Sequence, residues 1–242
     1  MAREQYQDRL EDLRESVLDM GDLVVERLNT GLDALSRRND RLARSVIAGD
    51  EGVNDQYLAI EAECIHLLAL EQPVAGDLRL VAASFKIATD LERMGDLASN
   101  LGEYALAAER EAFPEVDVGE LGRVALWMVE ASLEAYATGD AWACREVAAR
   151  DDDLDALCEH ASEVVFGELI ATELDAAGSS GTAEAGAVGA SAATGDDAIE
   201  ALMMDVSRLL LTIRDLERVG DHAVNVAART LYMAENDPEL IY

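Results

Sequence analysis

The sequence predicts an all-α protein made of two tandem three-helix bundles, and three observations predict it. Half of the 242 residues are apolar but only 5% are aromatic, and the abundant Ala, Leu, Glu and Arg favour helices over strands. Apolar residues recur every three or four positions through long segments, as on one side of a helix. The string DLERMGDLASN at 90–100 returns as DLERVGDHAVN at 215–225, with eight of eleven positions identical, which indicates internal duplication.

The first half of the chain predicts three main helices and one short one. Residues 3 to about 37 carry a single apolar stripe and predict a long helix. A short helix to Ala48 is expected to follow, with Asn39 or Asp40 as its cap. The next helix includes residues 57–71, and Pro73 is expected at the start of a third main helix over about 74–109, where its missing N–H is harmless.

The second half repeats this plan after a break at 112–120. Residues 121–140 match the first long helix, and ARDDDLDAL matches AGDEGVNDQY with Asp151 over Asp50, an offset of 101. The repeated string is offset by 125, so the second half contains an insertion. The Gly/Ala/Ser-rich segment at about 176–196 accounts for it as a flexible loop. We therefore predict two related units, residues 1–112 and 113–242.

The charge and the cysteines limit the function classes. The formal net charge is −31, and such a field repels nucleic-acid phosphates and anionic membranes, so no nucleic-acid partner is expected. Acidic residues are spread along the whole chain, which predicts a halophilic source in which salt screens self-repulsion. The three cysteines are widely spaced and fit a reducing compartment. With no apolar run near 18 residues and no signal-peptide pattern, we expect a cytoplasmic protein without membrane insertion.

The repeated string places oxygen-bearing side chains on one helical face. In the first copy Glu92, Asp96 and Asn100 follow each other at four-residue steps, and Glu103 returns to the same sector. The second copy has Glu217, Asp221 and Asn225 in the same register. Hard oxygen ligands one turn apart suit a metal ion. His222 directly follows Asp221 and is a weaker candidate that could add a nitrogen ligand.

The plain alternative is that each stripe is the solvated face of an ordinary helix in an acidic protein. Two features favour a site instead. Composition alone would not hold Glu and Asp in one register in both halves. Gly95 and Gly220 also lie in mid-helix, where glycine costs about 1 kcal/mol relative to alanine, so a close approach of a backbone, a side chain or an ion is expected there. Arg93 and Arg218 flank the stripes and are expected to pair with a carboxylate from a neighbouring helix.

These residues carry a family resemblance. The segment QPVAGDLRLVAASFKIATDLERMGD at 72–96 resembles the signature helix of the PhoU family, regulators of phosphate uptake, and RDLERVGDHAVNVA at 214–227 resembles its second copy. The resemblance implies two three-helix bundles, and polynuclear iron or zinc bound through Glu92, Asp96, Glu217 and Asp221. The stretch before the second string departs from the first, so the two sites are expected to differ in affinity.

The resemblance also implies partners and structural pairs. It implies a homodimer and negative control of a phosphate-specific ABC transporter, with a sensor kinase as a further partner. Asp77 and Arg79 belong to the family signature and are expected to form a structural ion pair, and Asp90 and Asp215, which open the two strings, are expected to be structural as well. No attached DNA-binding segment is visible.

Two other functions fit the residues. One is a carboxylate-bridged metalloenzyme, which an exposed stripe disfavours because metal catalysis requires a shaped, dry cavity. The other is a metal-free dimeric scaffold that regulates another transporter. The single Glu-x-x-His at Glu63–His66 does not favour a ferritin-like di-iron centre, because that chemistry needs the motif twice. No phosphate-binding glycine loop or nucleophile elbow is found, so an enzyme is not expected.

Overall fold

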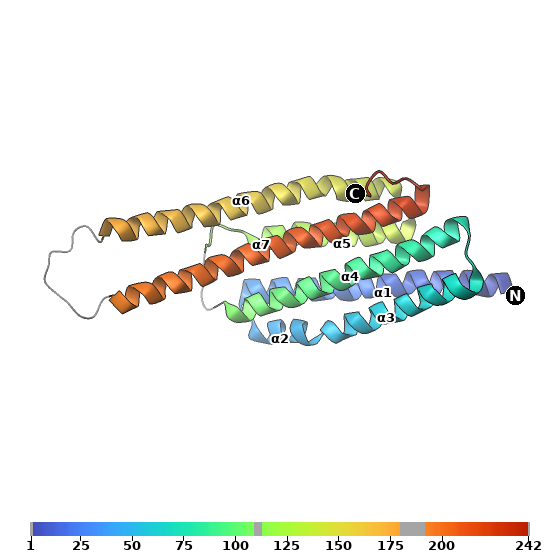
Figure 1. Ribbon diagram of the computed structural model, residues 1–242, viewed down its shortest axis with the longest axis horizontal. Coiled ribbons are helices and arrows are strands. Elements are labelled where there is room, and N and C mark those ends of the chain that lie inside the picture. Colours follow the sequence, from blue (N-terminus) through green and yellow to red (C-terminus); the bar gives the residue numbers. More distant parts are fainter. Residues whose placement is uncertain (1, 109–112, 180–191, 242) are drawn as a thin grey trace.

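The protein is an elongated, all-helical molecule, seen in a computed structural model that describes residues 2–108, 113–179 and 192–241 (Figure 1). Within these residues there is no strand, so the predicted fold class is confirmed. The first unit contains α1 (Ala2–Arg37), α2 (Asp40–Ala48), α3 (Asp50–His66), the π-helix η1 (Leu67–Glu71) and α4 (Ala75–Ala107). The second contains α5 (Val118–Thr138), α6 (Ala141–Ser179) and α7 (Ala192–Glu235).

The same capping chemistry begins the matching helices of the two units. The Asn39 side chain accepts hydrogen bonds from the backbone N–H groups of Arg41 and Leu42 at the start of α2. At the start of α6, Asp140 accepts from the N–H groups of Trp142 and Ala143. Both caps satisfy N–H groups that lack a partner within the helix. The offset of 101 residues inferred from the sequence therefore holds in three dimensions, with α6 corresponding to α2 and α3 together.

Three boundaries differ from the prediction. Helix α4 begins at Ala75, two residues after Pro73, and Val74 is its extended N-cap, because the residue after a proline need not enter the helix at once. The segment 67–71 is a π-helix and not a continuation of α3. Helix α6 continues to Ser179 and α7 starts at Ala192, so both ends of the predicted loop at 176–196 are helical, while 180–191 lies outside the described residues.

A pseudo-two-fold axis relates the two units, and two helix pairs cross at it. Helices α4 and α7 run antiparallel along the middle of the molecule (Figure 1). Helices α1 and α5 cross through a reciprocal pair of contacts, in which Gly21 lies against Leu133 and Gly122 lies against Leu32. The offset of 101 converts one contact into the other. The absent Cβ of each glycine leaves the space that the leucine fills.

One continuous hydrophobic core runs through both units. Its fully buried side chains come from the stripes seen in the sequence, among them Met20 of α1, Met94 of α4 and Met128 of α5. All three cysteines are buried and unpaired. Among the described residues, no helix combines the length and the apolar character needed to cross a membrane. The core fixes α4 and α7 in register, and this register positions the residues of the repeated string.

Candidate functional site

Glycine lets a neighbouring helix approach the repeated string in both units. A Cβ at Gly95 would lie 3.0 Å from a methyl group of Val53 on α3, and a Cβ at Gly220 would lie 2.5 Å from a methyl group of Leu154 on α6. Val53 and Leu154 are equivalent at the offset of 101. A side chain therefore explains the mid-helix glycines, and its approach brings the starts of α3 and of the matching part of α6 beside the acidic stripes.

A first carboxylate set, Asp50, Glu92 and Asp96, forms where α3 meets α4. Burial, followed by the repulsion of Asp96, raises the pKa of Glu92. Burial, followed by the repulsion of Asp50, raises the pKa of Asp96. The side-chain amide of Asn54 donates a hydrogen bond to the Oδ2 atom of Asp50 at 3.3 Å. The first set thus contains two residues predicted from the repeated string, Glu92 and Asp96, and one that the string did not predict, Asp50.

A second carboxylate set, Asp151, Asp155, Glu217 and Asp221, forms where α6 meets α7. Burial raises the pKa of Asp151 to about 6, and the other three members of the set add repulsion. Burial and then Asp155 raise the pKa of Glu217. The Oδ1 atom of Asp151 is buried and has no hydrogen-bond partner, which is costly for a carboxylate oxygen. Four negative groups therefore share one surface, with one buried oxygen unsatisfied.

The other residues of the predicted stripe lie elsewhere. The Asn100 amide donates to Asp215 at 3.0 Å, and the Asn225 amide donates to Asp90 at 3.4 Å. These two hydrogen bonds cross between α4 and α7 and exchange under the pseudo-two-fold axis. Glu103 is exposed farther along α4. The amides of both asparagines therefore join the two units and are not bonded to either carboxylate set.

His222 and Tyr104 complete the connection between the units. The Nδ1 atom of His222 lies 2.9 Å from Asp90, and since a carboxylate only accepts, Nδ1 carries the proton. The Tyr104 hydroxyl donates to Asp215 at 2.9 Å. Burial, with this hydrogen bond next, raises the pKa of Tyr104 to about 12. His222 thus binds the aspartate that opens the other string.

The arginines of the two strings pair locally. The Arg218 guanidinium lies 3.4 Å from Asp215, and that of Arg93 lies 4.0 Å from Asp90, in both cases three residues along the same helix. Each arginine thus pairs with the aspartate that opens its own string, and Arg218 also lowers the pKa of Asp96 on the neighbouring helix α4. Arg79 donates to the backbone carbonyl of Met233 in the second unit at 3.3 Å, a contact that replaces the pair expected with Asp77.

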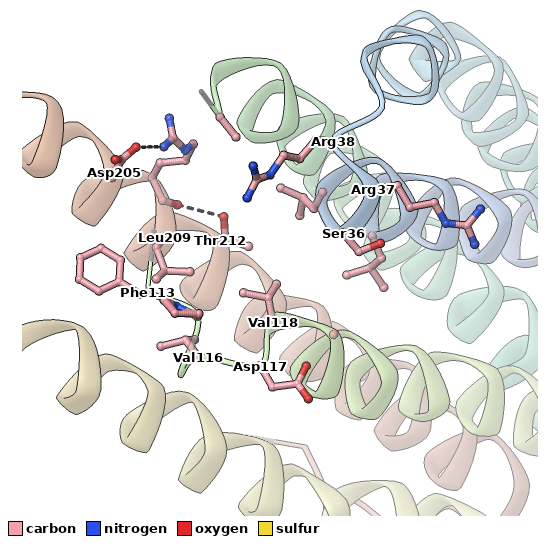
Figure 2. A pocket seen from close by; sticks show the side chains of 16 residues that line it. Ser36, Arg37, Arg38, Phe113, Val116, Asp117, Val118, Asp205, Leu209 and Thr212 are labelled. Carbon is pink, nitrogen blue, oxygen red and sulfur yellow. Dashed lines mark hydrogen bonds and ion pairs between the residues drawn. The ribbon is translucent and has the colours of Figure 1, made fainter. Parts of the chain in front are cut away.

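One cavity lies apart from both sets. Its volume is about 610 Å³, and it lies where α1 ends, α5 begins and α7 passes. Figure 2 shows Arg38 directed into it on the side of Thr212, and Asp205, which pairs with Arg208, at its edge. None of its lining residues belongs to a carboxylate set. The two sets therefore lie on helical surfaces and outside this cavity.

Fold and site together define a class of protein: a duplicated helical bundle with one carboxylate set on the outer side of each half. The PhoU domain model matches residues 17–105 and 118–184. A "Phosphate-specific transport system accessory protein PhoU homolog" from Caulobacter vibrioides (strain NA1000 / CB15N) is 32% identical over 92% of this chain and 86% of its own length. The chain belongs to the PhoU family.

Solved structures agree with this assignment. The crystal structure of PhoU from Pseudomonas aeruginosa superposes with a TM-score of 0.80 at 29% identity, over 96% of this chain and 100% of that chain. The phosphate transport system regulatory protein PhoU from Streptococcus pneumoniae superposes with a TM-score of 0.77 at 26% identity, over 96% and 98%. The family resemblance and the bundle architecture predicted from the sequence are confirmed.

Proposed function

We propose that this protein is a negative regulator of phosphate uptake, acting on a phosphate-specific ABC transporter or on its signalling partner. Family membership carries this proposal, because relatives aligned over nearly the whole chain bear the name of phosphate-specific transport accessory proteins. Regulation would proceed through binding and not through turnover. The homodimer, the sensor kinase and the cytoplasmic location stay predictions from the resemblance and the composition.

We further propose that the two carboxylate sets bind metal ions. The donor chemistry fits, because a group of carboxylates suits hard cations such as iron(II) or manganese(II) and also accepts zinc. The unsatisfied buried Oδ1 of Asp151 is an oxygen that a cation would satisfy. Among the described residues, however, no three His, Cys, Asp or Glu side chains stand close enough together to hold one ion. Binding would therefore require side-chain movement within each set.

The residues of each set have a defined task in this proposal. Asp151 and Asp155 would hold the ion from α6, and Glu217 and Asp221 from α7, so that repulsion between the helices becomes attraction. Asp50 would act from α3 in the first unit, with Glu92 and Asp96 from α4. A bound cation supplies charge neutralisation and open coordination positions for an anion. The helices would thus be tightened at a surface available to a partner.

Phosphate uptake in phosphate-rich medium tests the proposal. A deletion strain should take up more phosphate than its parent, and the wild-type gene should restore the parental rate. The double variant Glu217→Gln/Asp221→Asn should fail to restore it. The matched control is Glu11→Gln/Glu15→Gln, which removes an exposed acidic pair with the same spacing from α1. Unchanged uptake in the deletion strain would remove the phosphate assignment, and full rescue by the Glu217/Asp221 variant would remove the role of the second set.

A further inference from the structure

The two carboxylate sets differ at one buried position on the helix that supports them. Arg27 on α1 is 5% exposed, and its Nη2 atom donates to Asp50 at 3.1 Å, to Ser99 at 2.7 Å and to the backbone carbonyl of Gly95 at 3.3 Å. Ser99 in turn donates to Asp50 at 3.0 Å. The first set thus contains a guanidinium whose Nη2 atom contacts both α3 and α4, while its buried Nε and Nη1 atoms have no hydrogen-bond partner.

Met128 on α5 occupies the equivalent position in the second unit. The offset of 101 that relates Asp50 to Asp151 and Asn39 to Asp140 also relates Arg27 to Met128. The geometry agrees: Arg27 contacts the carbonyl of Gly95, and the Met128 methyl lies 3.5 Å from the place of a Cβ on Gly220. A thioether has no charge to offer a carboxylate. The second set therefore lacks the internal cation of the first.

A second difference acts in the same direction. Asn54 stands in the first unit where Asp155 stands in the second, and its amide donates to Asp50. The first set therefore holds three carboxylates and one buried guanidinium, whereas the second holds four carboxylates. Arginines outside the sets do not reverse this contrast, because Arg93 and Arg218 lower the pKa values of Glu92 and Asp96 in the first set, and Arg214 lowers that of Glu217 in the second. The second set concentrates more negative charge, and one of its buried oxygens has no partner.

We propose that Arg27 serves as the built-in cation of the first carboxylate set, and that a divalent metal ion binds preferentially to the second set. This inference rests on the metal-binding part of the proposed function. A guanidinium beside Asp50 already supplies positive charge and hydrogen bonds to that carboxylate. An incoming cation would have to displace those bonds and would meet the repulsion of a charge that cannot be deprotonated. At Met128 neither obstacle exists, so the two halves of a duplicated fold perform different tasks.

Equilibrium dialysis of the full-length protein against Mn²⁺ tests the inference. The wild type should bind at the second set first, and Glu217→Gln/Asp221→Asn should abolish this binding while Glu92→Gln/Asp96→Asn leaves it unchanged. Arg27→Met should raise the affinity of the first set by about tenfold or more, from the Coulomb interaction of a unit charge with a dication at side-chain distance. The added site should disappear when Glu92→Gln/Asp96→Asn is combined with Arg27→Met.

Two further variants and the melting temperature test whether the effect on Mn²⁺ binding is specific to the position of Arg27. Arg44→Met removes the same charge from an exposed position on α2 and should not change Mn²⁺ binding. Met128→Arg should weaken binding at the second set. Without metal, Arg27→Met should lower the melting temperature because Asp50 loses its buried partner, and Mn²⁺ should restore it.

The outcomes separate this inference from the proposal beneath it. Equal Mn²⁺ binding at both sets of the wild type, or no gain in Arg27→Met, would overturn the role of Arg27 while metal binding stands. No Mn²⁺ binding by any variant would overturn both.

Discussion

The carboxylate of Asp151 is expected to destabilise the folded protein at neutral pH. Burial and four neighbouring acids hold its pKa at about 6, well above the ordinary value for aspartate of about 3.9. A difference of about two pH units corresponds to roughly 3 kcal/mol, and the partial exposure of the side chain reduces this to about 1 kcal/mol. Replacing Asp151 by Asn should therefore stabilise the metal-free protein by about that amount, a rise in Tm of about 2–4 °C.

The dependence on pH distinguishes this cause from a general effect of net charge. Because the folded pKa lies above the unfolded one, the cost is present above about pH 6 and disappears as the pH falls toward about 4. Urea unfolding followed by circular dichroism should thus show that the advantage of Asp151→Asn shrinks on acidification. Asp152→Asn removes the same charge from an exposed neighbour and should give less than half the effect. A destabilised Asp151→Asn protein, or an advantage independent of pH, would refute the reasoning.

Three further predictions concern the fold. Raising KCl should increase Tm, because screening reduces the self-repulsion of a chain with a net charge of −31; maximal stability near zero salt would contradict this. Asp90→Asn and His222→Ala should show a coupling of about 1–2 kcal/mol in a double-mutant cycle, since the two side chains bind each other across the units; additive effects would argue against that bond. Gly102→Ala should cost about 1–3 kcal/mol, because its Cβ would lie 2.9 Å from the backbone carbonyl of Ala43, whereas Gly76→Ala on the same helix meets nothing and should cost little. Equal urea midpoints for these two variants would contradict the packing argument.

The helices and the duplication were predictable because both depend on spacing along the chain. Apolar periodicity locates each helix, and the repeated string and the Asp50–Asp151 match give the two offsets. The π-helix at Leu67–Glu71 was not predictable, since its apolar residues also fit an ordinary helical turn. Periodicity also does not say which helices cross, so the antiparallel packing of α4 on α7 had no signal in the spacing.

The site was predictable in part for the same reason. The register of one helix places Glu92 with Asp96 and Glu217 with Asp221. The members that come from other helices, Asp50, Asp151 and Asp155, had a usable signal, since the two segments that contain them match at the offset of 101. Arg27 had a weaker signal: it is a charged residue between Val24 and Leu28 on a stripe that is otherwise buried. Recognising its importance requires the tertiary contact with Gly95.

The repeated string keeps its polar residues because the same stretch of helix contacts the other unit, a neighbouring helix of its own unit and a carboxylate set. In the first copy Asp90 and Asn100 face the other unit, Gly95 admits Val53 from α3, and Glu92 with Asp96 faces outward beside Asp50. The second copy does the same, with Asp215, Asn225 and Gly220 in those places. A change at a carboxylate set therefore acts on a helix whose opposite side joins the two units. We therefore expect that a ligand that shifts Glu217 or Asp221 would also change the hydrogen bonds of His222 and Asn225 to Asp90, because all four residues lie on one stretch of α7.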